Sequence, residues 1–150
     1  HSAIVTSFMA HKGEAEDKHL DLVLDDRSVT GDDCYADMEP SDASLVFDNL
    51  IENAIMYTDE GSILVTFEPR GHEIAVIVQD TGIGIPQTDQ SRIFERFYRV
   101  DKARSREVGG TGLGLSLVRH AVERSKGRVS VKSNPGEGSQ FTVVFPRAKR

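Results

Sequence analysis

The sequence has a single cysteine, Cys34, among its 150 residues, so it cannot form an internal disulfide. A chain of this length buries roughly 70% of the surface that its unfolded state exposes, and it needs no cross-link to hold a core. We therefore expect residues 1–150 to form one domain that folds in a reducing compartment such as the cytoplasm.

Long apolar runs and a secretory signal pattern are also missing. The longest apolar runs, such as IAVIV at 74–78, are far shorter than the roughly 20 residues of a membrane-spanning helix. Acidic residues outnumber basic ones, 24 to 18, and the net charge of −6 argues against a nucleic-acid partner, because phosphate backbones are held by clustered Lys and Arg. We expect a soluble, monomeric fragment without internal repeats.

Hydrophobic periodicity predicts an alternation of helices and strands. The expected helices cover residues 4–18, 40–58 and 89–96, and a fourth is opened by the glycine cluster at 109–114 and ends near Ser125. The expected strands cover 20–26, 34–38, 62–69, 72–80, 128–133 and 139–146. Two hairpins follow from this order, one turning at Arg70-Gly71 and the other around NPGEG at 134–138. The order predicts an α+β fold, a two-layer α/β sandwich in which about three helices pack on one face of a mixed sheet.

The segment GGTGLG at 109–114 places four glycines directly before a predicted helix. It does not have the G-x-G-x-x-G spacing of dinucleotide-binding folds, and Leu115 stands where a P-loop needs lysine. Successive backbone N–H groups before a helix start can still hold an anion. A glycine-rich linker explains the segment equally well.

A second glycine segment, DTGIGIP at 80–86, follows a predicted strand directly. Asp80 at the strand end can accept a hydrogen bond from an exocyclic amino group such as N6 of adenine. Gly82 and Gly84 let a flat ring approach the backbone. Taken alone, the segment also fits an Asx-type turn that leaves a strand.

Two further segments carry polar groups in suggestive positions. Asn49 and Asn53 lie one helical turn apart, and amide oxygens are suitable hard ligands for Mg²⁺, although a solvated helix face fits either residue alone. FERFYRV at 94–100 combines aromatic residues with arginines, which also fits a core-packed short helix with surface arginines.

Together, four segments resemble one family. DNLIENAIMYT, DTGIGIP, IFERFYRVD and GGTGLGLSLV resemble, in this order, the N, G1, F and G2 boxes of the catalytic ATP-binding domain of sensor histidine kinases, within the superfamily that includes gyrase B, Hsp90 and MutL. The closing GRVSVKSNPGEGSQFTVVFP resembles the terminal hairpin of that family. The likeness extends from about Leu20 to the end of the chain, and it implies the Bergerat-type ATP-binding fold.

The resemblance implies a role for each matched residue, with ATP and Mg²⁺ as cofactors. Asn53 would coordinate Mg²⁺, Asn49 would lie near the phosphates, Tyr57 would pack by the nucleotide, and Asp80 would read adenine N6. The base pocket would be lined by Gly82, Gly84, Ile85 and Ile93. The phosphates would be held by Gly110, Thr111, Gly112, Leu113, Gly114 and Leu115. Residues 98–109 would be a mobile lid in which Tyr98 and Lys102 contact the nucleotide, Arg99 contacts the γ-phosphate, and Arg104 and Arg106 are auxiliary cations.

Two departures from the family pattern bear on the reaction. Met56 stands where these kinases commonly carry lysine, so one phosphate contact is missing. Asn49 stands where the hydrolytic relatives carry a glutamate base, and an amide cannot take a proton from water. The resemblance therefore implies transfer of phosphate to an external acceptor in preference to ATP hydrolysis.

The partners follow from the same resemblance. The phosphorylated histidine of this family lies in a dimerisation domain that precedes the ATP-binding domain, and none of the five histidines here has that context. The implied partners are this phosphoacceptor domain and a response regulator, in a homodimeric parent protein of the bacterial plasma membrane. Two alternatives remain, a non-catalytic nucleotide-binding module and a serine kinase of the anti-sigma-factor type. Kinases of the latter type lack an F box, so the segment FERFYRV in this chain argues against that alternative.

Overall fold

The computed structural model describes residues 2–25, 38–95 and 114–146. Five strands form one sheet in the spatial order β1 (Asp21–Asp25), β2 (Ser62–Arg70), β3 (Glu73–Asp80), β5 (Gly138–Pro146) and β4 (Arg128–Asn134). Strand β1 pairs with β2 in parallel, and all other neighbours are antiparallel. The sheet is therefore mixed, as the sequence predicts.

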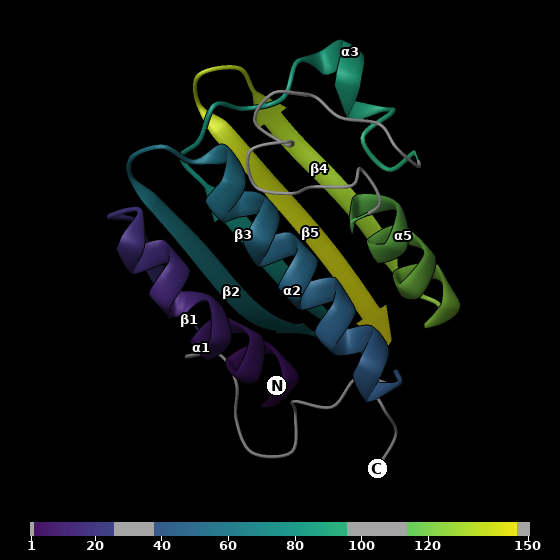
Figure 1. Cartoon of the computed structure of the whole chain (residues 1–150). Coiled ribbons are helices and arrows are strands. Elements are labelled where there is room, and N and C mark those ends of the chain that lie inside the picture. The colour runs from purple at the N-terminus through teal and green to yellow at the C-terminus, as the bar shows by residue number, and fades with distance from the viewer. Residues whose placement is uncertain (1, 26–37, 96–113, 147–150) are drawn as a thin grey trace.

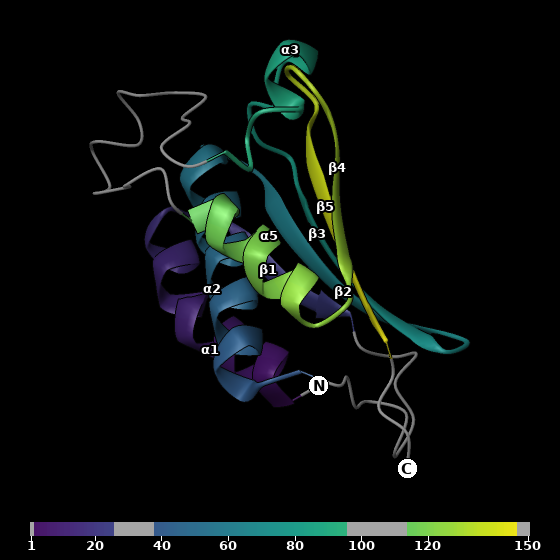
Figure 2. The same cartoon turned by 90° about the vertical axis from the view of Figure 1, so that its right-hand side faces the viewer.

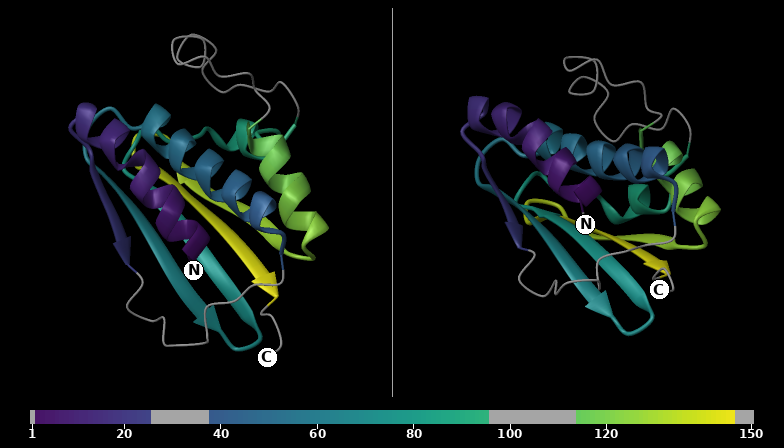
Figure 3. Two further views of the ribbon diagram at one scale, coloured as in Figure 1. Left: turned by 60° about the horizontal axis from the view of Figure 1, so that its bottom comes forward. Right: turned by 90° about the horizontal axis from the view of Figure 1, so that it is seen from below.

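Three helices cover one face of this sheet. They are α1 (Ser2–Asp17), α2 (Pro40–Tyr57) and α5 (Gly114–Arg124), with α2 in the middle (Figure 1). Seen from the side and from below, the helices form one layer and the strands a second (Figures 2 and 3). The predicted two-layer α+β sandwich is confirmed.

The core lies between these two layers. Helix α2 begins with Pro40, whose missing N–H costs nothing in the first turn, and it buries an apolar stripe. That stripe consists of Ala43, Val46, Phe47, Leu50, Ile51, Ala54 and Ile55. Opposite it, alternate residues of β3 and β5 are buried, among them Val76 and Phe145. The rings of Phe47 and Phe145 meet edge to face at 6.3 Å, which ties the central helix to the central strands.

An ion pair connects the two helices that flank the candidate site. Arg124, in the last turn of α5, donates two hydrogen bonds to Asp42 in the first turn of α2, one of them from Nε to Oδ2 at 3.1 Å. The Arg124 guanidinium lowers the pKa of Asp42, mainly through these hydrogen bonds. The pair fixes the start of α2 against the end of α5.

Two predicted boundaries need correction, and a third prediction is not tested. The short helix expected at 89–96 is α3 (Gln87–Gln90), which starts directly after Pro86 and gives way to turns over 91–95. The first hairpin turns at Gly71 and His72, because Arg70 still pairs with Glu73 and Gly71 adopts a φ of 61°. The strand expected at 34–38 lies outside the described residues except for Met38, which is in a bend.

None of the helices in residues 2–25, 38–95 and 114–146 is both long enough and apolar enough to cross a bilayer.

Candidate functional site

Asp80, the last residue of β3, is a buried carboxylate with only 4% of its surface exposed. Its Oδ1 accepts hydrogen bonds from the backbone N–H of Gly82, at 2.9 Å, and of Ser139, at 3.1 Å. Among the described residues, no hydrogen bond ends on Oδ2. One oxygen therefore forms the Asx-type turn, and the other can accept a further hydrogen bond.

Burial dominates the electrostatics of this carboxylate. Removal from water raises the pKa of Asp80, and the two backbone N–H donors offset only part of that rise. A buried carboxylate held this way lowers the stability of the fold when it ionises, so its presence calls for a reason other than stability.

The segment after Asp80 packs against the C-terminal end of α2. The N–H of Ile83 donates to the carbonyl oxygen of Tyr57 at 3.0 Å. A Cβ at Gly82 would lie 2.2 Å from that same carbonyl oxygen and 2.9 Å from Oγ1 of Thr58. Position 82 therefore needs glycine because the segment after Asp80 approaches the end of α2 closely. The sequence interpretation had instead explained this glycine by the approach of a ligand ring.

The same segment packs on its other side against the β4–β5 turn. Gly84 has a φ of 75°, and a Cβ there would lie 2.1 Å from the carbonyl oxygen of Asn134. The N–H of Gly136 donates to the carbonyl of Ile83 at 2.8 Å. Residues 80–86 are therefore held between α2 and the turn, which gives Asp80 a fixed frame.

Asn49 lies against the start of α5. Its Nδ2 donates to the carbonyl of Leu45 at 2.7 Å, which fixes the rotation of the amide. Its Oδ1 points at Gly114, where a Cβ would lie only 2.8 Å away. The structure therefore brings the predicted phosphate-side asparagine next to the first residue of the helix that follows the glycine cluster.

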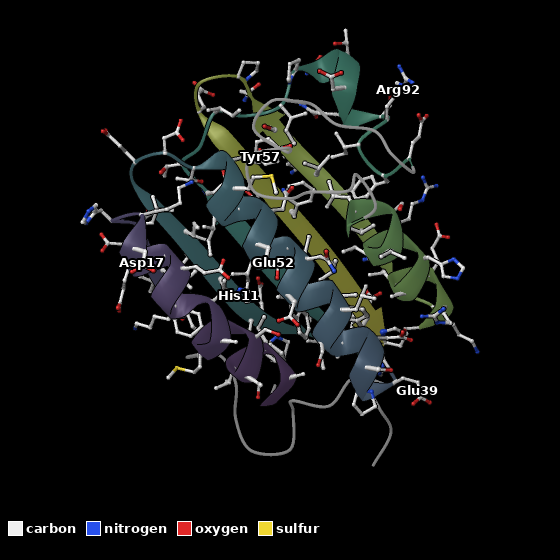
Figure 4. All side chains as sticks on the ribbon, viewed as in Figure 1. His11, Asp17, Glu39, Glu52, Tyr57 and Arg92 are labelled. Atoms are coloured by element: carbon white, nitrogen blue, oxygen red, sulfur yellow. The ribbon has the colours of Figure 1, made fainter. Side chains whose placement is uncertain are left out.

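Asn53 lies one turn further along α2, between Asn49 and Tyr57. It is half-buried, and no hydrogen bond between described residues involves its side chain. Figure 4 shows Tyr57 at the end of α2 on the side of α3 and Arg92. One face of α2 thus links the start of α5 to the segment after Asp80, with the Asn53 amide between them.

The apolar residues predicted for the base pocket are buried. Ile85 is 8% exposed and Ile93 is 3% exposed, and Leu115 is partly buried against the same core. Phe94 packs edge to face on Phe141, with ring centroids 6.3 Å apart. Phe94 thus packs against the core, whereas residues 96–100 of the segment FERFYRV lie outside the described residues, so the interpretation of that segment as a short helix with surface arginines is not tested.

A larger set of predicted residues lies outside the described part of the chain. It comprises Tyr98, Arg99, Lys102, Arg104, Arg106, Gly110, Thr111, Gly112, Leu113 and the lid over 98–109.

No carboxylate or imidazole cluster competes for a metal ion among the residues that the structure describes. Mg²⁺ binds through few protein groups and completes its shell with water and phosphate oxygens. The amide oxygen of Asn53, which has no partner in the described residues, is a donor of this kind.

Four polar residues of this region are missing from the sequence interpretation. They are Thr58, Gln90, Ser133 and Ser139, which contact the segment after Asp80 or flank it. Thr58 and Ser139 are buried, and Oγ1 of Thr58 has no hydrogen-bond partner among described residues. A serine directly before or directly after a predicted turn is too common a signal to identify such contacts.

A family model described as "Histidine kinase-, DNA gyrase B-, and HSP90-like ATPase" matches residues 38–149. The chain belongs to this family. The match covers the strands and helices that carry Asn49, Asn53 and Asp80, and the suspected family resemblance is confirmed.

Named relatives of this ATPase-family chain are sensor kinases. The chain is 50% identical over 99 residues to the "Sensor-like histidine kinase SenX3" of Mycolicibacterium smegmatis, which covers 65% of this chain and 26% of that protein. It is 37% identical over 135 residues to the "Sensor histidine kinase WalK" of Bacillus subtilis, covering 87% of this chain and 21% of the relative. The chain therefore spans about a quarter or less of the length of these relatives.

Solved structures support the fold. The catalytic domain of histidine kinase ThkA, in a nucleotide-free form, superposes with a TM-score of 0.82 at 23% identity, covering 99% of this chain and 94% of that one. Full-length ShkA in complex with AMPPNP has the same TM-score and identity, over 99% of this chain and 30% of that one. The two-layer fold of this ATPase-family chain is thus also the fold of histidine kinase catalytic domains.

Proposed function

We propose that this chain binds Mg-ATP beside Asp80 and Asn53 and transfers the γ-phosphoryl group to a histidine on a separate dimerisation domain. The observation that carries the proposal is the buried Asp80, whose Oδ1 is held by two backbone N–H groups while Oδ2 has no hydrogen bond among described residues. The family match and the naming of the relatives as sensor kinases support the same conclusion.

The base of the nucleotide lies, in this proposal, against the segment 80–86. Oδ2 of Asp80 accepts from the exocyclic N6 amino group of adenine, and a guanine, which carries a carbonyl there, would meet oxygen with oxygen. The fixed frame formed by α2 and the β4–β5 turn keeps this acceptor in place before the ligand arrives. Selection for adenine follows.

The phosphates lie, in this proposal, toward Asn49, Asn53 and the start of α5. The amide oxygen of Asn53 would hold Mg²⁺, which would neutralise phosphate charge, and the N–H groups at the start of α5 favour anions. The γ-phosphate contact of Arg99, the nucleotide contacts of Tyr98 and Lys102, and the phosphate contacts of Gly110, Thr111, Gly112 and Leu113 are part of the same proposal. Phosphoryl transfer needs mainly such positioning and charge neutralisation.

Transfer to an acceptor is favoured over hydrolysis by the residue at position 49. Asn49 has its amide nitrogen committed to the Leu45 carbonyl and its oxygen beside Gly114, so it offers no base for water. The acceptor histidine then comes from the dimerisation domain of a homodimeric parent kinase, and the phosphate passes on to a response regulator. We place the chain on the cytoplasmic side of a plasma-membrane sensor.

Two measurements test the proposed function. Titration of the chain with a non-hydrolysable ATP analogue, with and without Mg²⁺, is expected to show saturable binding that Mg²⁺ strengthens. Adding a dimeric phosphoacceptor fragment and γ-labelled ATP is expected to move label to the acceptor and leave the chain itself unlabelled. No saturable binding would contradict the whole proposal.

Binding without transfer would instead favour a nucleotide-binding module. Met56, which stands where a lysine is common in these kinases, is the feature that favours this second candidate. The variant Met56→Lys separates the two, because restored transfer would identify the missing cation as the cause.

A further inference from the structure

The backbone of Ile85 is held by side chains from two other segments. Its N–H donates to Oγ of Ser133 at 2.7 Å, and its carbonyl accepts from Nε2 of Gln90 at 2.9 Å. The same Nε2 also donates to the carbonyl of Ser133 at 2.8 Å. Ile85 follows the end of β3 and belongs to no strand, so these side chains take the place of a strand partner for its polar groups.

The hydroxyl of Ser133 has all its hydrogen-bonding capacity in use. It lies 2.7 Å from the carbonyl oxygen of Gly138 and 2.9 Å from Oγ of Ser139, in addition to the Ile85 N–H. A hydroxyl has one donor and two acceptor positions. Ser133 therefore donates to Gly138 and accepts from both Ile85 and Ser139.

These contacts connect Ser133 to Asp80 by two routes, one to the carboxylate and one to the backbone. Ser139, which shares a hydrogen bond with Ser133, uses its own N–H to hold Oδ1 of Asp80 at 3.1 Å. Gly138 packs so closely on the backbone of Asp80 that a Cβ on the glycine would lie 2.0 Å from the Asp80 carbonyl oxygen. The Ser133 hydroxyl thus connects Ile85, in the segment after Asp80, to Ser139, whose N–H orients the Asp80 carboxylate.

We infer that Ser133 is a positioning residue for base recognition, which fixes the direction of the Asp80 carboxylate through Ser139 and holds the segment after Asp80 through the Ile85 backbone. Gln90 holds the same backbone through its Nε2, which donates to the carbonyls of Ile85 and Ser133. The inference rests on the proposed function, because it assigns Ser133 to the adenine end of the same site. Ser133 does not need to touch the base.

The test compares two nucleotides on two serine variants of the same strand. Ser133→Ala removes the hydroxyl, and Ser130→Ala is the matched control, since Ser130 is exposed and its side chain makes no hydrogen bond among described residues. The dissociation constants of ATP and of purine riboside triphosphate, which lacks the 6-amino group, are measured for both variants and for the wild type. We expect Ser133→Ala to weaken ATP binding by about fivefold to tenfold and to leave the analogue nearly unchanged.

The deciding quantity is the dissociation constant of the analogue divided by that of ATP, which Ser133→Ala is expected to lower. A merely structural role for Ser133 would lower the thermal stability of Ser133→Ala and leave the ratio as in the wild type, which would overturn the inference. Ser133→Thr, which keeps the hydroxyl, is expected to restore the wild-type ratio, and Ser130→Ala to leave it unaltered. A wild-type chain that binds both nucleotides equally would overturn the proposed function and this inference with it.

A second variant, Gln90→Ala, allows the same measurement if Ser133→Ala does not fold. Gln90 is half-buried at the end of α3, so Gln90→Ala removes the other half of the arrangement with less effect on the core. Gln90→Ala is expected to lower this ratio as Ser133→Ala does. An unchanged ratio would count against the inference.

Discussion

The side-chain oxygen of Asn49 faces Gly114 so closely that a Cβ on the glycine would lie 2.8 Å away. Helix α2 and the first residue of α5 therefore approach closely at this point because Gly114 has no side chain beside the Asn49 amide oxygen. Asn49 is held from behind by the carbonyl of Leu45, so its oxygen has a defined direction. This contact leads to a prediction that separates stability from binding.

Gly114→Ala is expected to displace the Asn49 amide and to weaken ATP binding, while the fold is retained because alanine favours the helix. The control is Gly13→Ala in α1, where no atom lies within 4 Å of the added Cβ. That variant should gain about 0.5–1 kcal/mol of stability and bind ATP as the wild type does. Thermal unfolding and ATP titration of both variants provide the measurement, and equal ATP affinities would disprove the link between Gly114 and the site.

Asp80→Asn is expected to stabilise the nucleotide-free fold at neutral pH. Burial raises the pKa of Asp80 above its ordinary value of 3.8, so its stabilising contribution exists below pH 3.8 and is lost as the pH rises through the folded pKa. The asparagine oxygen can still accept from Gly82 and Ser139 without an ionised group. Denaturant unfolding of both proteins across the acidic range should show a gain that shrinks as the pH falls toward 3.8; a variant less stable than the wild type at neutral pH would refute this.

The opposite pH profile is expected at the ion pair of Asp42 and Arg124. Arg124 lowers the pKa of Asp42 below 3.8, so the pair contributes stability above this pH and loses it as the pH falls through the folded pKa. Asp42→Asn should therefore destabilise the fold at neutral pH, by an amount that disappears in strong acid. Glu123→Gln, which breaks the exposed pair with Arg119, is the control and should change little. Equal stabilities of Asp42→Asn and wild type at pH 7 would show that the pair contributes nothing.

Asn53→Ala is expected to reduce the Mg²⁺ dependence of ATP binding, because it removes the amide oxygen proposed as the metal ligand. Asn134→Ala serves as the matched control, since the exposed Asn134 side chain lies at the end of β4, outside α2. Titrations with ATP at several Mg²⁺ concentrations give the answer. Full retention of the Mg²⁺ effect in Asn53→Ala would place the metal elsewhere.

The sequence predicts much of this arrangement because the key residues interrupt regular patterns. Asp80 ends an apolar strand, and Asn49 and Asn53 are amides one turn apart on a helix that also carries an apolar stripe, so their positions can be recognised in the sequence. The strands and the three long helices follow from periodicity in the same way. The predicted mixed sheet depends only on the order of these elements.

The contacts around Ile85 could not be predicted in this way. Ser133 lies 48 positions from Ile85 in the chain, and only the folded sheet brings the two together. For the same reason, the conformational freedom of Gly82 and Gly84 was visible in the sequence, but its cause, the approach of Tyr57 and Asn134, was not. The short helix α3 was misplaced because Pro86 and the turns after Gln90 set its limits more strongly than apolar periodicity does.

The central claim is that the buried carboxylate of Asp80 selects adenine. Titration of wild type and Asp80→Asn with ATP and with GTP, in the presence of Mg²⁺, tests it most directly. The account predicts that the wild type prefers ATP, and that Asp80→Asn loses about 1–3 kcal/mol of ATP binding together with the preference. Equal binding of ATP and GTP by the wild type, or an unchanged preference in Asp80→Asn, would contradict the claim.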